Sequence, residues 1–110
     1  MRAKKIGASD GFSVILDVEG NVYTCGKGNY VRLGHNNEND LSLFKKIPPA
    51  LFDGAEIQDI AFGGRHCLAT TSHLLYGWGF NFYYQLGLGI GNREDNLIPV
   101  QIKSFYSDIT

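Results

Sequence analysis

The feature that most constrains this chain is an internal repeat. Residues 22–34 align with residues 75–87, 53 positions further on, and the two segments share five of thirteen residues. Segments of this composition would share about one residue by chance. Upstream, Ile6 aligns with Ile60 and Phe12 with His66, at an offset of 54. The one-residue difference falls in a turn, where structural repeats tolerate changes of length.

Each repeat unit has the pattern of short strands joined by tight turns. Gly20-Asn21 is typical of a hairpin turn, and residues 63–65 indicate a second one. No window shows a sustained helical period, and Gly54 argues against a helix within 49–58. The predicted strands cover residues 12–16, 22–25, 44–47, 57–62, 66–71, 74–78 and 98–103.

Two prolines place strands at sheet edges, because proline cannot donate a hydrogen bond to a neighbouring strand. Pro48 follows the strand at 44–47, and Pro99 lies within the strand at 98–103. We align Ile47-Pro48 with Ile98-Pro99, at an offset of 51.

Composition supports an all-β chain. The 110 residues include 14 glycines and are 13% aromatic, which favours strands and turns over helices. A repeat of about 50 residues with three or four strands has the size of one β-propeller blade. We therefore expect about two antiparallel blades, the first (degenerate) at 1–53 and the second, with the start of another, at 54–110. Together they would form part of one propeller domain.

Charge and targeting signals point to the cytoplasm or the nucleus. The net charge of −1 gives no general attraction to nucleic acid. The N-terminus lacks the apolar core of a signal peptide, and the apolar stretch at 74–84 is too short to span a membrane. Cys25 and Cys67 are too few for a disulfide-rich secreted protein. Membrane binding and secretion are therefore not expected.

The sequence offers no catalytic, metal-binding or cofactor-binding constellation. His66 and Cys67 are adjacent, but neighbouring side chains on a strand point to opposite faces and cannot easily pair. The three histidines and two cysteines lack zinc spacing. Gly26-x-Gly28 is not followed by the Lys-Ser/Thr pair of a phosphate-binding loop. We expect no cofactor and no enzymatic activity.

Three segments of the second unit resemble the regulator of chromosome condensation repeat. Residues 63–69 (GGRHCLA) are similar to its G-x-x-H-[ST]-L-A strand. Residues 76–81 followed by 85–89 are similar to its W-G-x-N-x-x-G-Q-L-G-x-G segment, and residues 98–100 to its P-x-x-[IV] segment. The resemblance covers about residues 6–103 and implies blades of a seven-bladed β-propeller. It also implies a hydrogen bond from the His66 ring within its blade.

The resemblance assigns a structural role to a set of motif residues. In the second unit these are Gly63, His66, Leu68, Trp78, Gly79, Asn81, Gln85, Leu86, Gly87 and Pro99; in the first they are Gly26, Leu33, Gly34 and Pro48.

The first unit departs from the family pattern. Phe12 stands for the histidine, Cys25 for the tryptophan, Gly28 for the asparagine and Arg32 for the glutamine. Val31 and Tyr84 each replace a turn glycine, so both turns are expected to be distorted.

The resemblance implies a protein-interaction module that binds a partner through its loops. Candidate contact residues near the strand exits are Tyr30, Arg32, Phe82, Tyr83 and Tyr84. Two blades bury less than a closed ring, so self-association to complete a propeller is also expected.

Two other functions stay open. One is guanine-nucleotide exchange on a Ran-like small GTPase, although the spacings from Gly34 to Ile47 (13) and from Gly87 to Ile98 (11) leave no room for an inserted hairpin wedge. The other is a regulatory propeller piece of a ubiquitin ligase, or a fragment without activity of its own.

Overall fold

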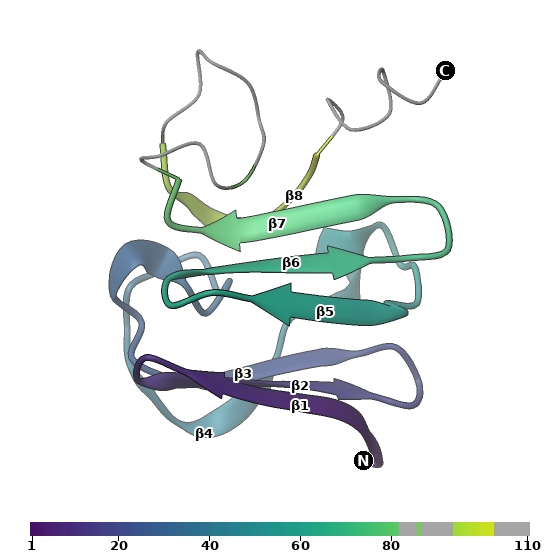
Figure 1. Cartoon of the computed structure of the whole chain (residues 1–110), viewed down its shortest axis with the longest axis horizontal. Helices are drawn as coiled ribbons and strands as arrows, with labels where there is room; N and C mark the ends of the chain where they lie inside the picture. Colours follow the sequence, from purple (N-terminus) through teal and green to yellow (C-terminus); the bar gives the residue numbers. More distant parts are fainter. Residues whose placement is uncertain (82–85, 87–93, 103–110) are drawn as a thin grey trace.

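The chain is all-β in a computed structural model that describes residues 1–81, 86 and 94–102. It forms two antiparallel four-stranded sheets, each a meander in which consecutive strands pair, as expected for propeller blades. Figure 1 shows the β5–β8 sheet lying above the β1–β4 sheet, with β5 next to β1.

The first sheet contains β1 (Ala3–Ser9), β2 (Phe12–Asp17), β3 (Val22–Gly26) and β4 (Leu41–Lys46). The second contains β5 (Asp59–Phe62), β6 (His66–Thr70), β7 (Leu75–Gly79) and β8 (Asn96–Gln101). The predicted division at residue 53 remains a prediction; each of its two parts contains one sheet.

Two single-turn 3-10 helices connect the strands. η1 (Asn29–Val31) follows β3, and η2 (Pro49–Phe52) links the two sheets. The short η2 agrees with the turn expected around residues 49–58. Within the described residues, no helix is long and apolar enough to cross a membrane.

The strand registers confirm the repeat. Ile6 pairs with Ile15 across β1 and β2, and Ile60 pairs with Ala69 across β5 and β6, so the offset of 54 holds for both strands of each pair. Tyr23 and Tyr76 likewise occupy matching positions on β3 and β7.

The alignment of the two prolines was wrong. Tyr23 pairs with Lys46, and Tyr76 with Gln101, which sets the offset of the fourth strands at 55 rather than 51. The backbone N–H groups of Ile47 and Ile102 then make matching bonds, to Val22 O and Leu75 O, both at 2.8 Å. The two prolines are therefore not equivalent, because the segment before the fourth strand is longer in the second unit.

The edge positions were predicted correctly. β4 and β8 are the edge strands of their sheets, and Pro99 lies in β8. Lys45 and Lys46 are exposed on β4, where charge discourages pairing with another chain.

The sequence did not predict β1. Its residues AKKIGAS are mostly exposed and lack a clear alternation of apolar and polar side chains. The boundaries of the other strands differ by one to three residues from expectation.

The core lies between the two sheets. β2 contributes Phe12, Val14 and Leu16 from one side, and β7 contributes Tyr76 and Trp78 from the other. Trp78 is fully buried, and its ring packs 5.8 Å from the ring of Phe52. Its indole Nε1 donates to the carbonyl oxygen of Arg32 at 3.1 Å.

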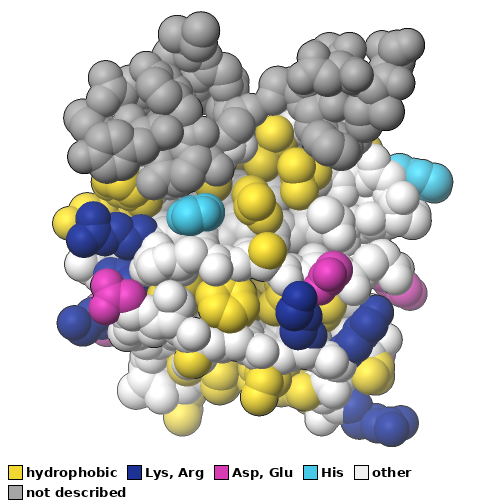
Figure 2. Space-filling model, in the orientation of Figure 1, with side chains coloured by type: hydrophobic (Ala, Val, Ile, Leu, Met, Phe, Trp, Pro, Cys, Tyr) yellow, Lys and Arg dark blue, Asp and Glu magenta, His cyan; other side chains and the backbone are white. Residues whose placement is uncertain are grey.

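Charges do not gather into one field on the face shown in Figure 2. Lys and Arg side chains lie at two opposite sides of this face, each with acidic side chains nearby.

Candidate protein-binding rim

One end of both sheets brings loops from the two blades together. The β1–β2 turn, the β5–β6 turn and η1 lie at the left end in Figure 1. Each blade fixes its own turn in the same way: Lys27 N donates to Gly11 O at 2.9 Å, and Phe80 N donates to Arg65 O at 2.8 Å.

Two matched glycines make these contacts geometrically feasible. Gly26 has φ +109° and Gly79 has φ +102°. A Cβ on Gly26 would lie 2.3 Å from Gly11 O, and one on Gly79 would lie 2.5 Å from Arg65 O. Both the backbone conformation and the close approach therefore require glycine, which explains why this residue is shared by the two units.

An arginine and two aromatic rings form a cluster at this end. The rings of Tyr30 and Phe80 meet edge to face, with centroids 5.2 Å apart. The guanidinium carbon of Arg65 lies 4.4 Å from the Tyr30 centroid and 5.7 Å from that of Phe80. Arg65 is exposed, and both rings are half-buried. We call Tyr30, Arg65 and Phe80 the rim cluster.

Arg65 stacks on aromatic rings and makes no ion pair with any residue that the structure describes. Within residues 1–81, 86 and 94–102, the one ion pair is Lys5 with Asp59, at 2.7 Å. The stack on Tyr30 orients the planar guanidinium of the exposed Arg65.

Arg32 is not a surface contact, which corrects its prediction as a candidate partner residue. Its side chain is 2% exposed. The guanidinium donates to the carbonyl oxygens of Asn29, Asp10 and Gly64 and to the side-chain oxygen of Asn29. Because Asp10 lies in the first blade and Gly64 in the second, Arg32 joins the blades beneath the rim cluster.

The strained backbone position in this turn is Tyr30, one residue before Val31, where distortion was expected. Tyr30 has φ +63° and ψ +19°, the left-handed region, whereas Val31 is not among the residues with positive φ. Such a conformation is costly for an aromatic residue and persists only where surrounding contacts fix it. Here the contacts are the ring of Phe80 and the two arginines.

The residues that directly follow β3 and β7 share a backbone-to-aspartate hydrogen bond. Gly28 N donates to Asp40 Oδ1 at 2.9 Å, and the matching Asn81 N donates to Asp95 Oδ1 at 3.0 Å. In the second blade the buried Asn81 side chain also accepts from Leu86 N at 3.0 Å. In the first blade, Arg32 and Asn29 take over this role of fixing the loop.

His66 and Cys67 point to opposite faces of β6, as predicted. Cys67 is buried between the sheets, and burial raises the pKa of its thiol well above the usual range. The half-buried His66 ring packs against Gly63, where an added Cβ would lie 2.5 Å from its Cε1. Burial lowers the pKa of His66. The hydrogen bond expected from this ring has no partner among the described residues.

The remaining motif residues take structural positions. Leu33 and Leu86 are buried, Leu68 lies half-buried on β6, and the Trp78 ring packs over Gly34. Pro48 is exposed and precedes η2. Five predicted residues lie outside the described part of the chain: Phe82, Tyr83, Tyr84, Gln85 and Gly87.

Sequence reasoning missed Arg65 and Phe80 as rim residues. Both lie within the quoted motifs, but the sequence does not show that they meet η1 of the other blade. An arginine in a tight turn, with an aromatic residue after the following hairpin, is the only sequence signal for them.

The strand order, the blade-to-blade core and the matched turns define a β-propeller repeat protein. The sequence model of the regulator of chromosome condensation (RCC1) repeat matches residues 19–70 and 72–110. The chain belongs to this family.

Several curated relatives are similar in sequence. The chain is 44% identical over 85 residues to the ultraviolet-B receptor UVR8 of Arabidopsis thaliana, covering 76% of this chain and 18% of the receptor. It is 37% identical over 89 residues to the human E3 ubiquitin-protein ligase HERC2, covering 80% of this chain and 2% of the ligase. It is 27% identical over 112 residues to the guanine nucleotide exchange factor SRM1 of Saccharomyces cerevisiae, covering 92% and 23%.

Solved structures share the fold. Human WBSCR16 matches with a TM-score of 0.79 and 26% identity, over 90% of this chain and 25% of that protein. Prp20p of Saccharomyces cerevisiae, whose structure was described together with its binding to Gsp1p and histones, matches with a TM-score of 0.79 and 25% identity, over 92% and 25%. The chain thus spans a quarter or less of the length of these proteins.

Proposed function

We propose that this chain is a protein-interaction module that binds a partner protein at the rim cluster. The observation that carries the proposal is the exposed Arg65, stacked 4.4 Å from the Tyr30 ring centroid and without an acidic partner among the described residues. Arginine and tyrosine are enriched among residues that dominate protein–protein binding energies.

The construction of the rim supports a binding role. Tyr30 is held in a strained conformation, and such strain concentrates at functional sites. Beneath it, the buried Arg32 ties both blades to η1, so the cluster is held in place before a partner arrives. Preorganisation lowers the entropic cost of binding. The predicted contacts Phe82, Tyr83 and Tyr84 stay part of this proposal.

The test compares Arg65→Ala with Lys46→Ala, which removes an exposed cation from the β4 edge. Both variants and the parent chain are immobilised, and bound proteins from a cell extract are quantified. We expect a group of proteins retained by the parent and by Lys46→Ala and reduced at least about tenfold by Arg65→Ala. Equal retention by Arg65→Ala would reject the rim as the binding site.

The second candidate function is guanine-nucleotide exchange on a small GTPase, as the whole chain or as part of an exchange factor. It is favoured by the similarity to SRM1, named as an exchange factor, and to Prp20p, described as binding Gsp1p. The assay follows release of a fluorescent guanine nucleotide from purified Gsp1p. No acceleration at micromolar concentrations of the chain would reject this function for it.

The similarity to HERC2 keeps a regulatory piece of a ubiquitin ligase as a further alternative. We propose the cytoplasm or the nucleus as the location. Both cysteines are free thiols, which fits a reducing compartment.

A further inference from the structure

The two sheets pack head to tail, so each uses a different face. The front face is defined on the second sheet by Ile60, Phe62, Cys67, Ala69, Tyr76 and Trp78, which turn toward the first sheet. The back face is defined on the first sheet by Gly7, Val14, Leu16 and Val22, which turn toward the second. The observed contact is the front of the second sheet on the back of the first.

The contact is close and specific. An added Cβ on Gly7 would lie 1.9 Å from the Phe62 ring, so only glycine admits this ring. Phe62 also meets Phe12 edge to face, with centroids 6.4 Å apart. At one margin, Lys5 Nζ donates to Asp59 Oδ1 at 2.7 Å and to Ile60 O at 2.8 Å.

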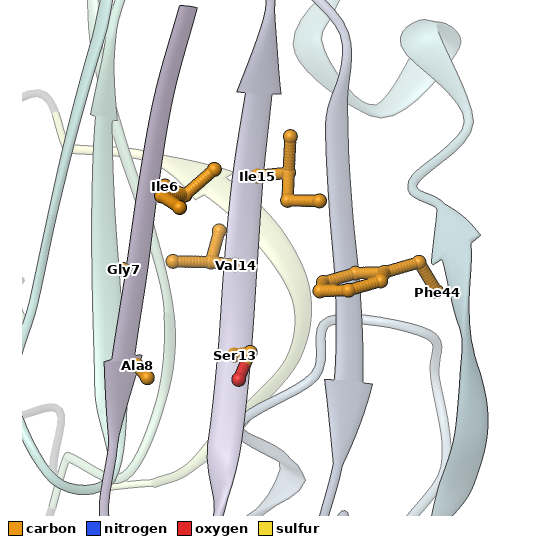
Figure 3. Close-up of a pocket in the computed structure, with 7 residues that line it drawn as sticks. All are labelled: Ile6, Gly7, Ala8, Ser13, Val14, Ile15 and Phe44. Carbon is orange, nitrogen blue, oxygen red and sulfur yellow. The ribbon is translucent and has the colours of Figure 1, made fainter. Parts of the chain in front are cut away.

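The repeat registers show that both sheets have a front face, and that only the front face of the second sheet is covered by the other sheet. Ile60 is 3% exposed, whereas the matching Ile6 on the first sheet is 68% exposed. A groove of about 420 Å³ follows the uncovered front face. It is lined by the front-face residues Ile6, Ala8, Ser13 and Ile15, by Phe44, and by Gly7 and Val14, which lie between the front-face residues along β1 and β2. Figure 3 shows Phe44 reaching from β4 across β3 toward β2, on the side where Ile6 and Ile15 lie.

The back face also exists twice. On the second sheet, Ala61, Leu68, Thr70 and Leu75 occupy the positions of Gly7, Val14, Leu16 and Val22. They line a second, smaller groove of about 150 Å³ together with Asp59 and Ile60. Within the part of the chain that the structure describes, the front face of the first sheet and the back face of the second are therefore left uncovered.

We propose that a second copy of this chain covers the front face of β1–β4 with the back face of its own β5–β8. This contact would repeat between chains the packing that joins the two blades within one chain. Because it uses two different surfaces, it is heterologous, and it extends into longer chains or rings rather than stopping at a symmetric dimer.

Size and charge at the matched positions fit this occupant. Within the chain, Phe62 packs over Gly7. At the matching positions between copies, Ala8 would pack over Ala61, so two small side chains take the place of a large side chain and a glycine. Lys5 and Asp59 occupy matching positions, so the copy-to-copy contact places Asp59 of one copy opposite Lys5 of the other. The contact between copies would therefore pair the same two opposite charges, with Lys5 on the sheet that supplies the front face and Asp59 on the sheet that supplies the back face.

The contact between copies is expected to be weaker than the contact within the chain. Trp78 fills the observed interface, whereas Cys25 stands at the matching front position of the first sheet. Without that ring, a dissociation constant on the order of micromolar or weaker is reasonable.

The test uses two single-face variants of the full chain and sedimentation velocity. Ile6→Glu places a charge on the front face, and Ala61→Glu places one on the back face; both positions are exposed, so the fold is retained. The parent chain should show a mass that rises with concentration from the 12.2 kDa monomer. Each variant alone should remain a monomer, and their equimolar mixture should form a 1:1 dimer through the intact front of one and the intact back of the other.

Leu43→Glu is the matched control. Leu43 is 79% exposed but alternates with Phe44 on β4 and points away from the groove. This variant should associate as the parent does. A parent chain that stays monomeric up to about 1 mM would overturn the proposal and leave the front face to a further repeat of the same chain. Association of the parent with no dimer in the mixture would also overturn it, because the contact would then use other surfaces.

Discussion

The two blades have the same strand framework but different side-chain contacts after their third strands. Their first three strands pair in the same registers, and Gly26 and Gly79 make the same close approach to the preceding turn. Yet after β7 the Asn81 side chain accepts a hydrogen bond from Leu86 N, whereas after β3 Arg32 donates to the backbone and side-chain oxygens of Asn29. Backbone pairing and glycine geometry thus preserve the blade while side chains above it are free to change.

The core offers the largest expected difference between the blades. Trp78→Ala should lower the free energy of unfolding by about 3–5 kcal/mol, because the ring is fully buried against Phe52 and Gly34. Cys25→Ala, at the matching position, should cost less than about 1 kcal/mol, because this side chain is only half-buried. Urea denaturation of both variants measures the two values. Equal losses would mean that the two positions are packed alike.

Substitution of the two arginines at the rim should also change stability by different amounts. Arg32→Met should cost about 2–3 kcal/mol, because it removes a buried guanidinium that donates to the partly buried carbonyl oxygens of Asp10 and Gly64. Arg65→Met should cost about 0.5–1 kcal/mol, the value of an exposed cation–π contact. Thermal melts of the two variants under the same conditions test the order. A reversed order would assign the structural role to Arg65.

Acid sensitivity should be confined to the first of two equivalent turns. Asp17 Oδ1 accepts from Glu19 N and Asn21 N, and at the matching position Thr71 Oγ1 accepts from His73 N and Leu74 N. Burial alone would raise the pKa of Asp17, but hydrogen bonds from Asn21, Tyr23 and Glu19 outweigh it and lower the pKa.

Because that pKa is lower in the folded state, the stabilisation is present above the unfolded value of about 3.9 and is lost as the pH falls through the folded pKa. Asp17→Thr should therefore flatten the decline in stability below about pH 4, while changing stability at pH 7 by about 1 kcal/mol or less. Unfolding free energies measured from pH 7 to pH 2 provide the comparison. An unchanged acid slope would show that other carboxyl groups determine it.

Much of the framework could be predicted from the sequence, because it depends on local patterns. Strands β2, β3, β6 and β7 follow from apolar alternation and glycine turns, and the burial of Trp78 follows from its place in the repeat. β1 was missed because its exposed residues carry no such pattern. The offset of the fourth strands was wrong because two Ile-Pro pairs suggested an equivalence that strand pairing does not support.

The candidate site was less predictable, because it is formed between blades. Tyr30 was singled out, but its stack with Arg65 and Phe80 depends on the approach of η1 to the β5–β6 turn. Arginine is usually a surface residue, so the sequence did not predict that Arg32 is buried. Its burial depends on carbonyl oxygens from both blades, which accept its hydrogen bonds.

The family repeat and the sheets are out of phase. The unit at 19–70 takes β3 and β4 from one sheet and β5 and β6 from the next, and the second unit begins at 72, between β6 and β7. The boundaries between repeat units therefore fall within sheets, not between them. A chain cut at residue 71 would leave the second sheet without its last two strands and expose a new edge. Adding or removing one repeat unit therefore changes two neighbouring blades at once.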